Sequence, residues 1–198
     1  MENKISRTLL DESFTYETYR KFVDYLLAKG KSTGTEQTPE RYEYTKLNVQ
    51  RMNRLDKSIV LNDELKAELA KLNRKLIWLV IVEAWCGDVS QILPALAKIS
   101  EESDMIEFRC ILRDENPGIM NQYLTNGAKS IPVLVCYDAE TLTEIWKWGP
   151  RPDEAQKMMM DMNAGGVAKE DRIIKIQLWY AENKSKSLQN EILNLLKT

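Results

Sequence analysis

The sequence predicts an α/β fold in which a mixed β-sheet is flanked by helices, with an all-helical N-terminal extension and a C-terminal helix. Apolar residues recur at helical spacing through about the first 75 positions, which indicates amphipathic helices. The pattern changes at position 76, where short apolar runs of strand length alternate with helical stretches. We therefore expect a helical extension (1–75), an α/β domain (76–165) and a C-terminal amphipathic helix (166–198) packed on that domain or on a partner subunit.

Three helices are predicted in the N-terminal extension. The first covers 13–29 and ends at Gly30, which opens a polar loop. Thr38 and Pro39 are a typical capping residue and first-turn proline, so a second helix begins there and runs to about position 57. Asn62 caps the third helix. The residues of the second helix that we expect to face inward are Tyr44, Leu47, Met52 and Leu55.

From position 76 the pattern is that of a βαβ unit followed by a β-hairpin and a helix, which implies a mixed sheet covered on both faces. The first apolar run is continuous, as expected for a strand buried on both sides. The predicted elements are strands at 76–82, 105–112, 131–137 and 144–148, and helices at 90–103, 116–127, from 152, and at 169–197 with an interruption near 183–187.

Composition excludes several classes of protein. A formal net charge of −2 argues against a nucleic-acid-binding protein and against a basic membrane-surface protein. The hydrophobic content of 43% is enough for a sizeable core, but no apolar run approaches the roughly 20 residues of a membrane span. The N-terminal residues Met1 to Lys4 precede no apolar stretch typical of a signal peptide, so we expect a cytoplasmic location.

Two absences restrict the chemistry. The chain contains no histidine, which excludes a histidine base and a Ser-His-Asp triad. The three cysteines, Cys86, Cys110 and Cys136, are far apart and form no Cys-x-x-Cys pair, so neither a structural zinc site nor a disulfide framework is expected. We expect no metal and no other cofactor.

The most informative segment runs from Trp85 to Val89. It places Cys86 between an apolar strand and an amphipathic helix, with its thiol at the start of that helix. The helix macrodipole and free backbone N–H groups stabilise a thiolate there, whereas the neighbouring carboxylate of Asp88 repels it. The two effects are of similar size, so the sequence leaves the pKa of Cys86 open. Val89 stands where a redox dithiol has its second cysteine.

Five motifs occur in an order that resembles the thioredoxin superfamily over roughly 76–162. They are Trp85-Cys86-Gly87, Pro94, the Asp-Glu-Asn-Pro-Gly segment 114–118, Ile131-Pro132 and Trp148-Gly149. The resemblance implies a thioredoxin-like fold and a cis peptide before Pro132. The helical extension and the Trp-Gly-Pro-Arg-Pro run at 148–152 are similar to a bacterial thioredoxin-like subgroup whose members often read Trp-Cys-Gly-Asp-Cys.

The chain departs from this family at residues that take part in the second step of its chemistry, the resolution of the mixed disulfide. Val89 replaces the cysteine that resolves a mixed disulfide, Val80 aligns with the family's buried acid, and Cys110 aligns with its accompanying lysine. Ordinary dithiol reductase activity is therefore not expected. A monothiol oxidoreductase fits the remaining thiol, and whether the chain is an enzyme stays open.

We assign the catalytic role to Cys86, with a relic thiol on a retained scaffold as the alternative. The residues that we expect to bind substrate are Trp85, Gly87, Asp88, Ile131, Pro132, Trp148 and Gly149. A cis proline exposes the backbone of the residue before it to an extended substrate, although a simple tight turn would also explain Pro132.

The two other cysteines are most simply read as small buried hydrophobes in strands. For Cys110 we keep a second hypothesis, in which it replaces the missing resolving thiol. This requires its Cα to lie within about 7 Å of that of Cys86. Cys136 is expected to be structural.

The sequence thus predicts a thioredoxin-like protein in thiol–disulfide redox chemistry, acting through Cys86 by mixed-disulfide exchange. Its partner would be a protein or a low-molecular-weight thiol or disulfide, with an external thiol as the resolving group. The alternative is a non-catalytic peptide-binding or interaction module that has lost redox turnover. A peroxidase-type cysteine is less favoured, because the sequence offers no activating Thr or Arg set near Cys86. The oligomeric state is left open, with a homodimer as one option.

Overall fold

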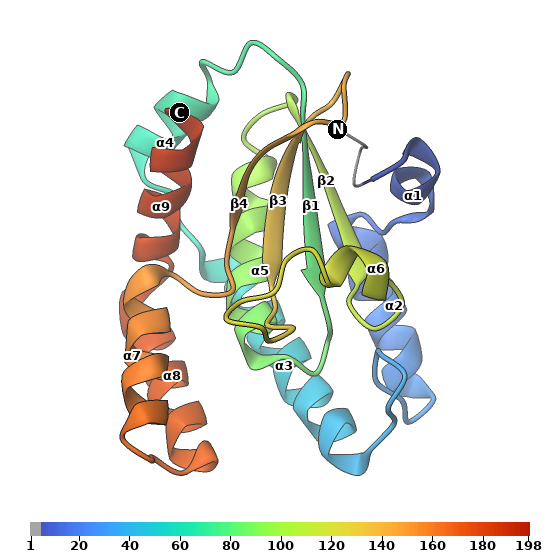
Figure 1. The fold of residues 1–198 in the computed structure, drawn as a ribbon, viewed down its shortest axis with the longest axis vertical. Coiled ribbons are helices and arrows are strands. Elements are labelled where there is room, and N and C mark those ends of the chain that lie inside the picture. Colours follow the sequence, from blue (N-terminus) through green and yellow to red (C-terminus); the bar gives the residue numbers. More distant parts are fainter. Residues whose placement is uncertain (1–4) are drawn as a thin grey trace.

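A four-stranded mixed β-sheet with the strand order β2-β1-β3-β4 lies at the centre of the structure (Figure 1). The structure is a computed structural model and describes residues 5–198, so the prediction for Met1 to Lys4 lies outside the described residues. The strands are β1 (Leu76–Val82), β2 (Ile106–Leu112), β3 (Val133–Asp138) and β4 (Glu144–Trp148). β1 pairs parallel with β2 and antiparallel with β3, and β3 pairs antiparallel with β4.

The helices surround this sheet. They are α1 (Arg7–Glu12), α2 (Tyr16–Ala28), α3 (Pro39–Ser58), α4 (Asp63–Leu69), α5 (Gly87–Ser100), α6 (Pro117–Met120), α7 (Asp153–Ala164), α8 (Lys169–Asn183) and α9 (Lys186–Leu196). α5 is the crossover between the parallel strands, and α3 packs against it. Figure 1 shows α4 beside α9 and α7 beside α8. The predicted α/β class with helices before and after the sheet is thus confirmed.

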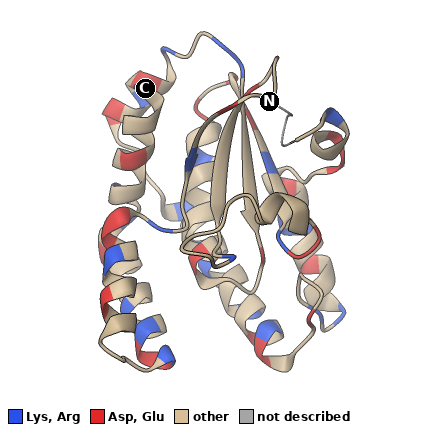
Figure 2. Cartoon of the chain, in the orientation of Figure 1, with Lys and Arg blue, Asp and Glu red and all other residues tan. Residues whose placement is uncertain are grey.

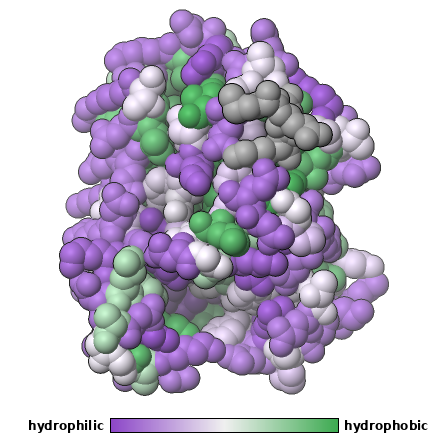
Figure 3. Space-filling model, in the orientation of Figure 1, coloured by the Kyte–Doolittle hydropathy of each residue, from purple (hydrophilic) through white to green (hydrophobic). Residues whose placement is uncertain are grey.

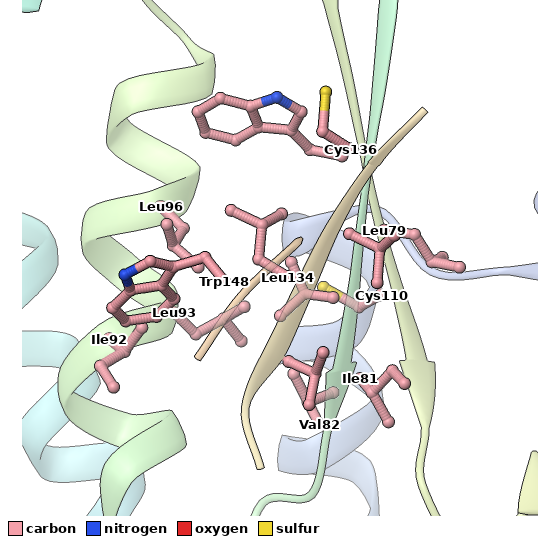
Figure 4. Packing of buried hydrophobic residues seen from close by; sticks show 14 of the residues in the cluster. Leu79, Ile81, Val82, Ile92, Leu93, Leu96, Cys110, Leu134, Cys136 and Trp148 are labelled. Atoms are coloured by element: carbon pink, nitrogen blue, oxygen red, sulfur yellow. The ribbon is translucent and has the colours of Figure 1, made fainter. Parts of the chain in front are cut away.

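One core cluster covers both faces of the sheet, with α5 packed on one of them (Figure 4). Every residue of β1 is buried, as the continuous apolar run predicts. One row of side chains crosses all four strands in register, from Cys110 through Val80 and Leu134 to Trp148. Figure 4 shows Leu134 and Trp148 of this row beside Leu93 and Leu96 of α5. Most charged residues lie on the helices and loops around this core, and few lie on the strands (Figure 2).

Helix starts follow the predicted capping chemistry. The side chain of Thr38 accepts a hydrogen bond from the N–H of Arg41, and that of Asn62 accepts one from the N–H of Leu65. At the other end of the chain, Lys184 and Ser185 both adopt positive φ and divide the predicted C-terminal helix into α8 and α9. α9 packs against α4 of the same chain, where the side chain of Gln189 bonds the backbone of Val60 and Asn62.

Three expectations from the sequence differ from the structure. α1 was not predicted, and the helix predicted at 116–127 is only the single turn of α6. Leu47, expected to face inward, is 42% exposed. α3 instead buries Thr45, Asn48 and Met52, because the polar side chains on this face bond neighbouring segments: Thr45 bonds Ser32, and Asn48 bonds the carbonyl of Ala84. A hydrophobicity pattern cannot reveal a face that is held by hydrogen bonds.

No helix within residues 5–198 combines the length and the apolar character that crossing a membrane requires.

The chain also makes one very close backbone approach at the end of β4. Peptide bonds Ile131–Pro132 and Gly149–Pro150 are cis, and Gly149 adopts a φ of 116°. A Cβ atom at Gly149 would lie 2.4 Å from the carbonyl oxygen of Pro132. Only glycine fits this position, because both the backbone angle and the space exclude a side chain.

We predict that Gly149→Ala lowers the free energy of unfolding by about 2–4 kcal/mol, since left-handed strain and backbone overlap both contribute. Gly30→Ala is the matched control, because Gly30 has a φ of 69° but nothing within 4 Å of the added methyl group. Gly30→Ala should lower the free energy of unfolding by about 1 kcal/mol. Urea denaturation measures both values, and equal losses would contradict the close approach.

Candidate functional site

Cys86 lies in the turn that joins β1 to α5, at the capping position of the helix. Its N–H donates to the carbonyl of Glu83 at 3.1 Å, and its carbonyl accepts the N–H of Ser90 at 3.2 Å, so the turn closes tightly at the strand end. The thiol is half-buried and donates a hydrogen bond to the carbonyl of Ile131 at 3.4 Å. The predicted strand–turn–helix arrangement around this thiol is therefore present.

The electrostatics of the site favour the neutral thiol. Burial, and next the carboxylate of Asp88, raise the pKa of Cys86 to about 12. The N–H groups of Val89 and Asp88 and the guanidinium of Arg151 act in the opposite direction. The N–H groups at the start of α5 thus lower the pKa of Cys86 by less than burial raises it, which favours the protonated thiol at neutral pH.

The carboxylate of Asp88 is fixed by two residues from the C-terminal third of the chain. One of its oxygens lies 2.5 Å from a guanidinium nitrogen of Arg151, and the other accepts a hydrogen bond from the hydroxyl of Tyr180 at 2.9 Å. Asp88 itself is only 8% exposed. This arrangement compensates the carboxylate and ties α5 to α8. Sequence reasoning missed both partners, because neither lies near Asp88 in the chain.

The thiol opens into a cavity of about 430 Å³ between α3 and α8. The lower half of Figure 3 shows the surface hollowed between α7 and α8 on one side and α3 on the other. The residues of the β1–α5 turn and of the first turn of α5 that line the cavity are Trp85, Cys86, Gly87 and Asp88. Further lining residues come from both flanking helices, among them Arg41, Tyr44, Arg51, Ile173, Ile176 and Gln177. Segments outside the strand–turn–helix motif therefore build most of its walls.

Trp85 forms the side of the cavity next to Arg41. The guanidinium groups of Arg41 and Arg113 lie 4.5 and 4.6 Å from the centre of its ring. Such contacts hold an indole ring by cation–π attraction. Both arginines also approach Asp114, at 3.7 and 2.8 Å. Trp85 is thus positioned by a charged network that the sequence did not reveal.

The four predicted binding residues Ile131, Pro132, Trp148 and Gly149 do not line this cavity. Ile131 and Pro132 are buried, and the carbonyl of Ile131 is engaged by the thiol of Cys86. Trp148 donates its indole N–H to Glu191 of α9 at 2.7 Å. Trp148 and Gly149 line a separate hollow with Tyr123 and Lys147. Their role in substrate binding stays a prediction, whereas their packing is evident.

The two other cysteines are free thiols inside the core. Cys110 pairs in register with Val80, six positions before Cys86, and its backbone exchanges two hydrogen bonds with Phe14. Burial raises the pKa of Cys110 far above its usual value, and raises that of Cys136 to about 12. A resolving role for Cys110 stays a prediction.

A buried acid does occur near the thiol, but at Glu83 rather than at the position of Val80. Glu83 is fully buried, and one carboxylate oxygen accepts the N–H of Asp114 at 2.9 Å. The side chain of Thr33 also forms a hydrogen bond with this carboxylate. Burial raises the pKa of Glu83. The signal in the sequence for this acid is a glutamate directly after an apolar strand.

In the described part of the chain, no three Cys, Asp or Glu side chains are grouped so that they could hold a metal ion.

Comparisons with known proteins agree on the fold. A family model described as thioredoxin matches residues 34–164. A crystal structure of an HIV epitope scaffold has a TM-score of 0.63 at 17% identity, with 98% of each chain covered. A protein of unknown function from Pseudomonas aeruginosa has a TM-score of 0.60 at 16% identity, again with 98% of each chain covered. No curated protein matches the chain.

We predict that the alkylation rate of Cys86 with iodoacetamide rises about 10-fold per pH unit between pH 7 and 10 without a plateau, because the thiolate fraction does so below the pKa. Asp88→Asn should raise the rate at pH 8 by about 10-fold, since it removes the charge that repels the thiolate. The exposed Asp161→Asn is the control and should change nothing. A plateau below pH 9 in the unmodified protein would contradict this assignment.

Proposed function

Since the chain belongs to the thioredoxin family, as the match over residues 34–164 shows, we propose that it exchanges disulfides through the single thiol of Cys86. One observation carries the proposal: Cys86 is the only one of the three cysteines that lines the cavity, while Cys110 and Cys136 are fully buried. The nucleophile comes from the chain, and the resolving thiol comes from outside it.

The exchange is a substitution at sulfur. The Cys86 thiolate attacks one sulfur of an external disulfide, a new S–S bond forms, and the old S–S bond breaks. The leaving thiolate takes up the proton that Cys86 has lost, so Cys86 is oxidised and half of the external disulfide is reduced. An external thiolate then attacks the outer sulfur of this mixed disulfide, and Cys86 leaves as a thiolate and is regenerated. The high pKa makes attack slow, although a more basic thiolate is also a stronger nucleophile.

The backbone groups around the Cys86 sulfur support this sequence of steps. The carbonyl of Ile131 accepts the S–H hydrogen bond, and the backbone N–H groups of Asp88 and Val89 are placed to donate to the sulfur when it becomes charged. The partner would be a thiol or disulfide of a protein or a small molecule. A chain with three free thiols suits a reducing compartment such as the cytoplasm.

A second candidate is a binding module without redox turnover. The raised pKa of Cys86 favours it, because so little thiolate is present at neutral pH. The apolar residues Val80 and Val89 also favour a binding module, because they stand where the resemblance to thioredoxins places the buried acid and the second cysteine. On this reading the cavity holds a ligand and the thiol is a remnant.

Intact-mass measurement after reaction with bis(2-hydroxyethyl) disulfide at pH 8 separates the two candidates. Exchange predicts one adduct per chain, located on Cys86, absent from Cys86→Ser and released by added thiol. A binding module predicts no adduct in the folded protein, and that result would overturn the proposal.

Restoring the second cysteine gives an independent test. We predict that Val89→Cys raises multiple-turnover reduction of the same disulfide at least about 10-fold, because an internal thiol resolves the mixed disulfide faster than an external one. Val89→Ser is the size-matched control and should stay at the level of the unmodified chain. No gain in Val89→Cys would contradict an intact redox scaffold.

A further inference from the structure

Within the described part of the chain, one cation that lines the cavity beside Cys86 forms no ion pair. Seven charged residues line it: Arg41, Arg51, Arg151, Lys169, Glu36, Glu40 and Asp88. Three pairs account for six of them. Arg41 lies 2.7 Å from Glu36, Arg151 lies 2.5 Å from Asp88, and Lys169 lies 3.6 Å from Glu40. Among the described residues, Arg51 alone in this set forms no ion pair.

Arg51 is held in a defined position next to the thiol. Its guanidinium donates to the side-chain oxygen of Asn48 at 2.9 Å, and Asn48 in turn donates to the carbonyl of Ala84 at 2.8 Å. Asn48 is fully buried, so this chain of bonds is rigid. Burial, and next the charge of Arg54, lower the pKa of Arg51, and the more distant carboxylate of Asp88 offsets these effects only in part.

A second hydrogen-bond donor, the side-chain amide of Gln177, faces Gly87 together with Arg51. A Cβ atom built on Gly87 would lie 3.2 Å from the amide nitrogen of Gln177 and 3.7 Å from a guanidinium nitrogen of Arg51. The oxygen of Gln177 accepts a hydrogen bond from Gln91, which turns the amide nitrogen of Gln177 towards Gly87. Two N–H donors from α3 and α8 thus converge one residue after Cys86, at the amino end of α5. Convergent donors of this kind match a carboxylate.

We propose that the disulfide exchanged at Cys86 is a low-molecular-weight compound that carries a carboxylate, bound by Arg51 and Gln177. This proposal rests on the proposed function and names its substrate class. The volume of about 430 Å³ suits a small molecule, and α3 and α8 flank the thiol on both sides. Asp88 repels an anion near Cys86, but its carboxylate is paired with Arg151 and bonded by Tyr180, whereas Arg51 forms no ion pair within the described residues.

The step balances as a disulfide exchange. The carboxylate stays bound to Arg51 while the Cys86 thiolate attacks the nearer sulfur of the compound. The S–S bond of the compound breaks, and its other half leaves as a thiolate that takes up the proton released from Cys86. The product is a mixed disulfide whose carboxylate remains beside Gly87.

Three symmetric disulfides of similar size test the charge preference: 3,3′-dithiodipropionate, bis(2-hydroxyethyl) disulfide and cystamine. They carry negative, neutral and positive groups. Intact-mass kinetics at pH 8 should show modification of Cys86 by the anionic compound about 10-fold faster than by the neutral one, as expected for a charge-assisted hydrogen bond. The cationic compound should be slowest.

Arg51→Met should abolish this preference, whereas Arg54→Met, which removes the same charge from an exposed position on the same helix, should retain it. Gln177→Leu is a second variant that leaves α3 untouched, and it should reduce the preference in the same direction. Circular dichroism checks that each variant is folded.

The outcomes separate the two proposals. Equal rates with all three disulfides, or a preference that survives in Arg51→Met, would overturn the carboxylate site and leave exchange at Cys86 intact. Absence of reaction with every disulfide would overturn the proposed function itself.

Discussion

The position of Cys86 depends on how the turn between β1 and α5 is held at Ala84. The N–H of Ala84 donates to the hydroxyl of Thr33 at 2.8 Å, and its carbonyl accepts the side chain of Asn48 at 2.8 Å. Both partners are buried and both come from the segment before the sheet. A buried backbone group without a partner is strongly unfavourable, so these two bonds fix the N-terminal segment against the turn that carries the thiol. The extension is therefore part of the site.

The C-terminal helices hold the same turn from the opposite side. Asp88 bonds Arg151 and Tyr180, so α5 begins between α3 and α8 rather than at an open surface. The thiol consequently lies at the floor of a cavity instead of on an exposed groove. The same burial raises the pKa of Cys86 to about 12. The placement of Cys86 between α3 and α8 thus has two consequences. The thiol faces a cavity of a size that suits a small disulfide, and it is protonated at rest.

The sequence predicted much of this fold because its signals are local. β1 and β4 have the predicted bounds, and the caps Thr38 and Asn62 begin their helices as expected. The site could be predicted only where it is continuous in the chain, from Trp85 to Asp88. Arg51, Arg151 and Gln177 reach the cavity through tertiary packing, which leaves no periodic pattern in the sequence. The pKa of Cys86 could not be derived either, because burial decides it and the sequence shows only the helix start and Asp88.

A crystal structure of the protein after reaction with 3,3′-dithiodipropionate is the decisive measurement, because it locates the attached group. The expected position of the carboxyethylthio group is on Cys86, between α3 and α8, with its carboxylate within hydrogen-bond distance of Arg51. A group directed instead along Trp148 and Gly149, or attached to Cys110 with Cys86 unmodified, would contradict it.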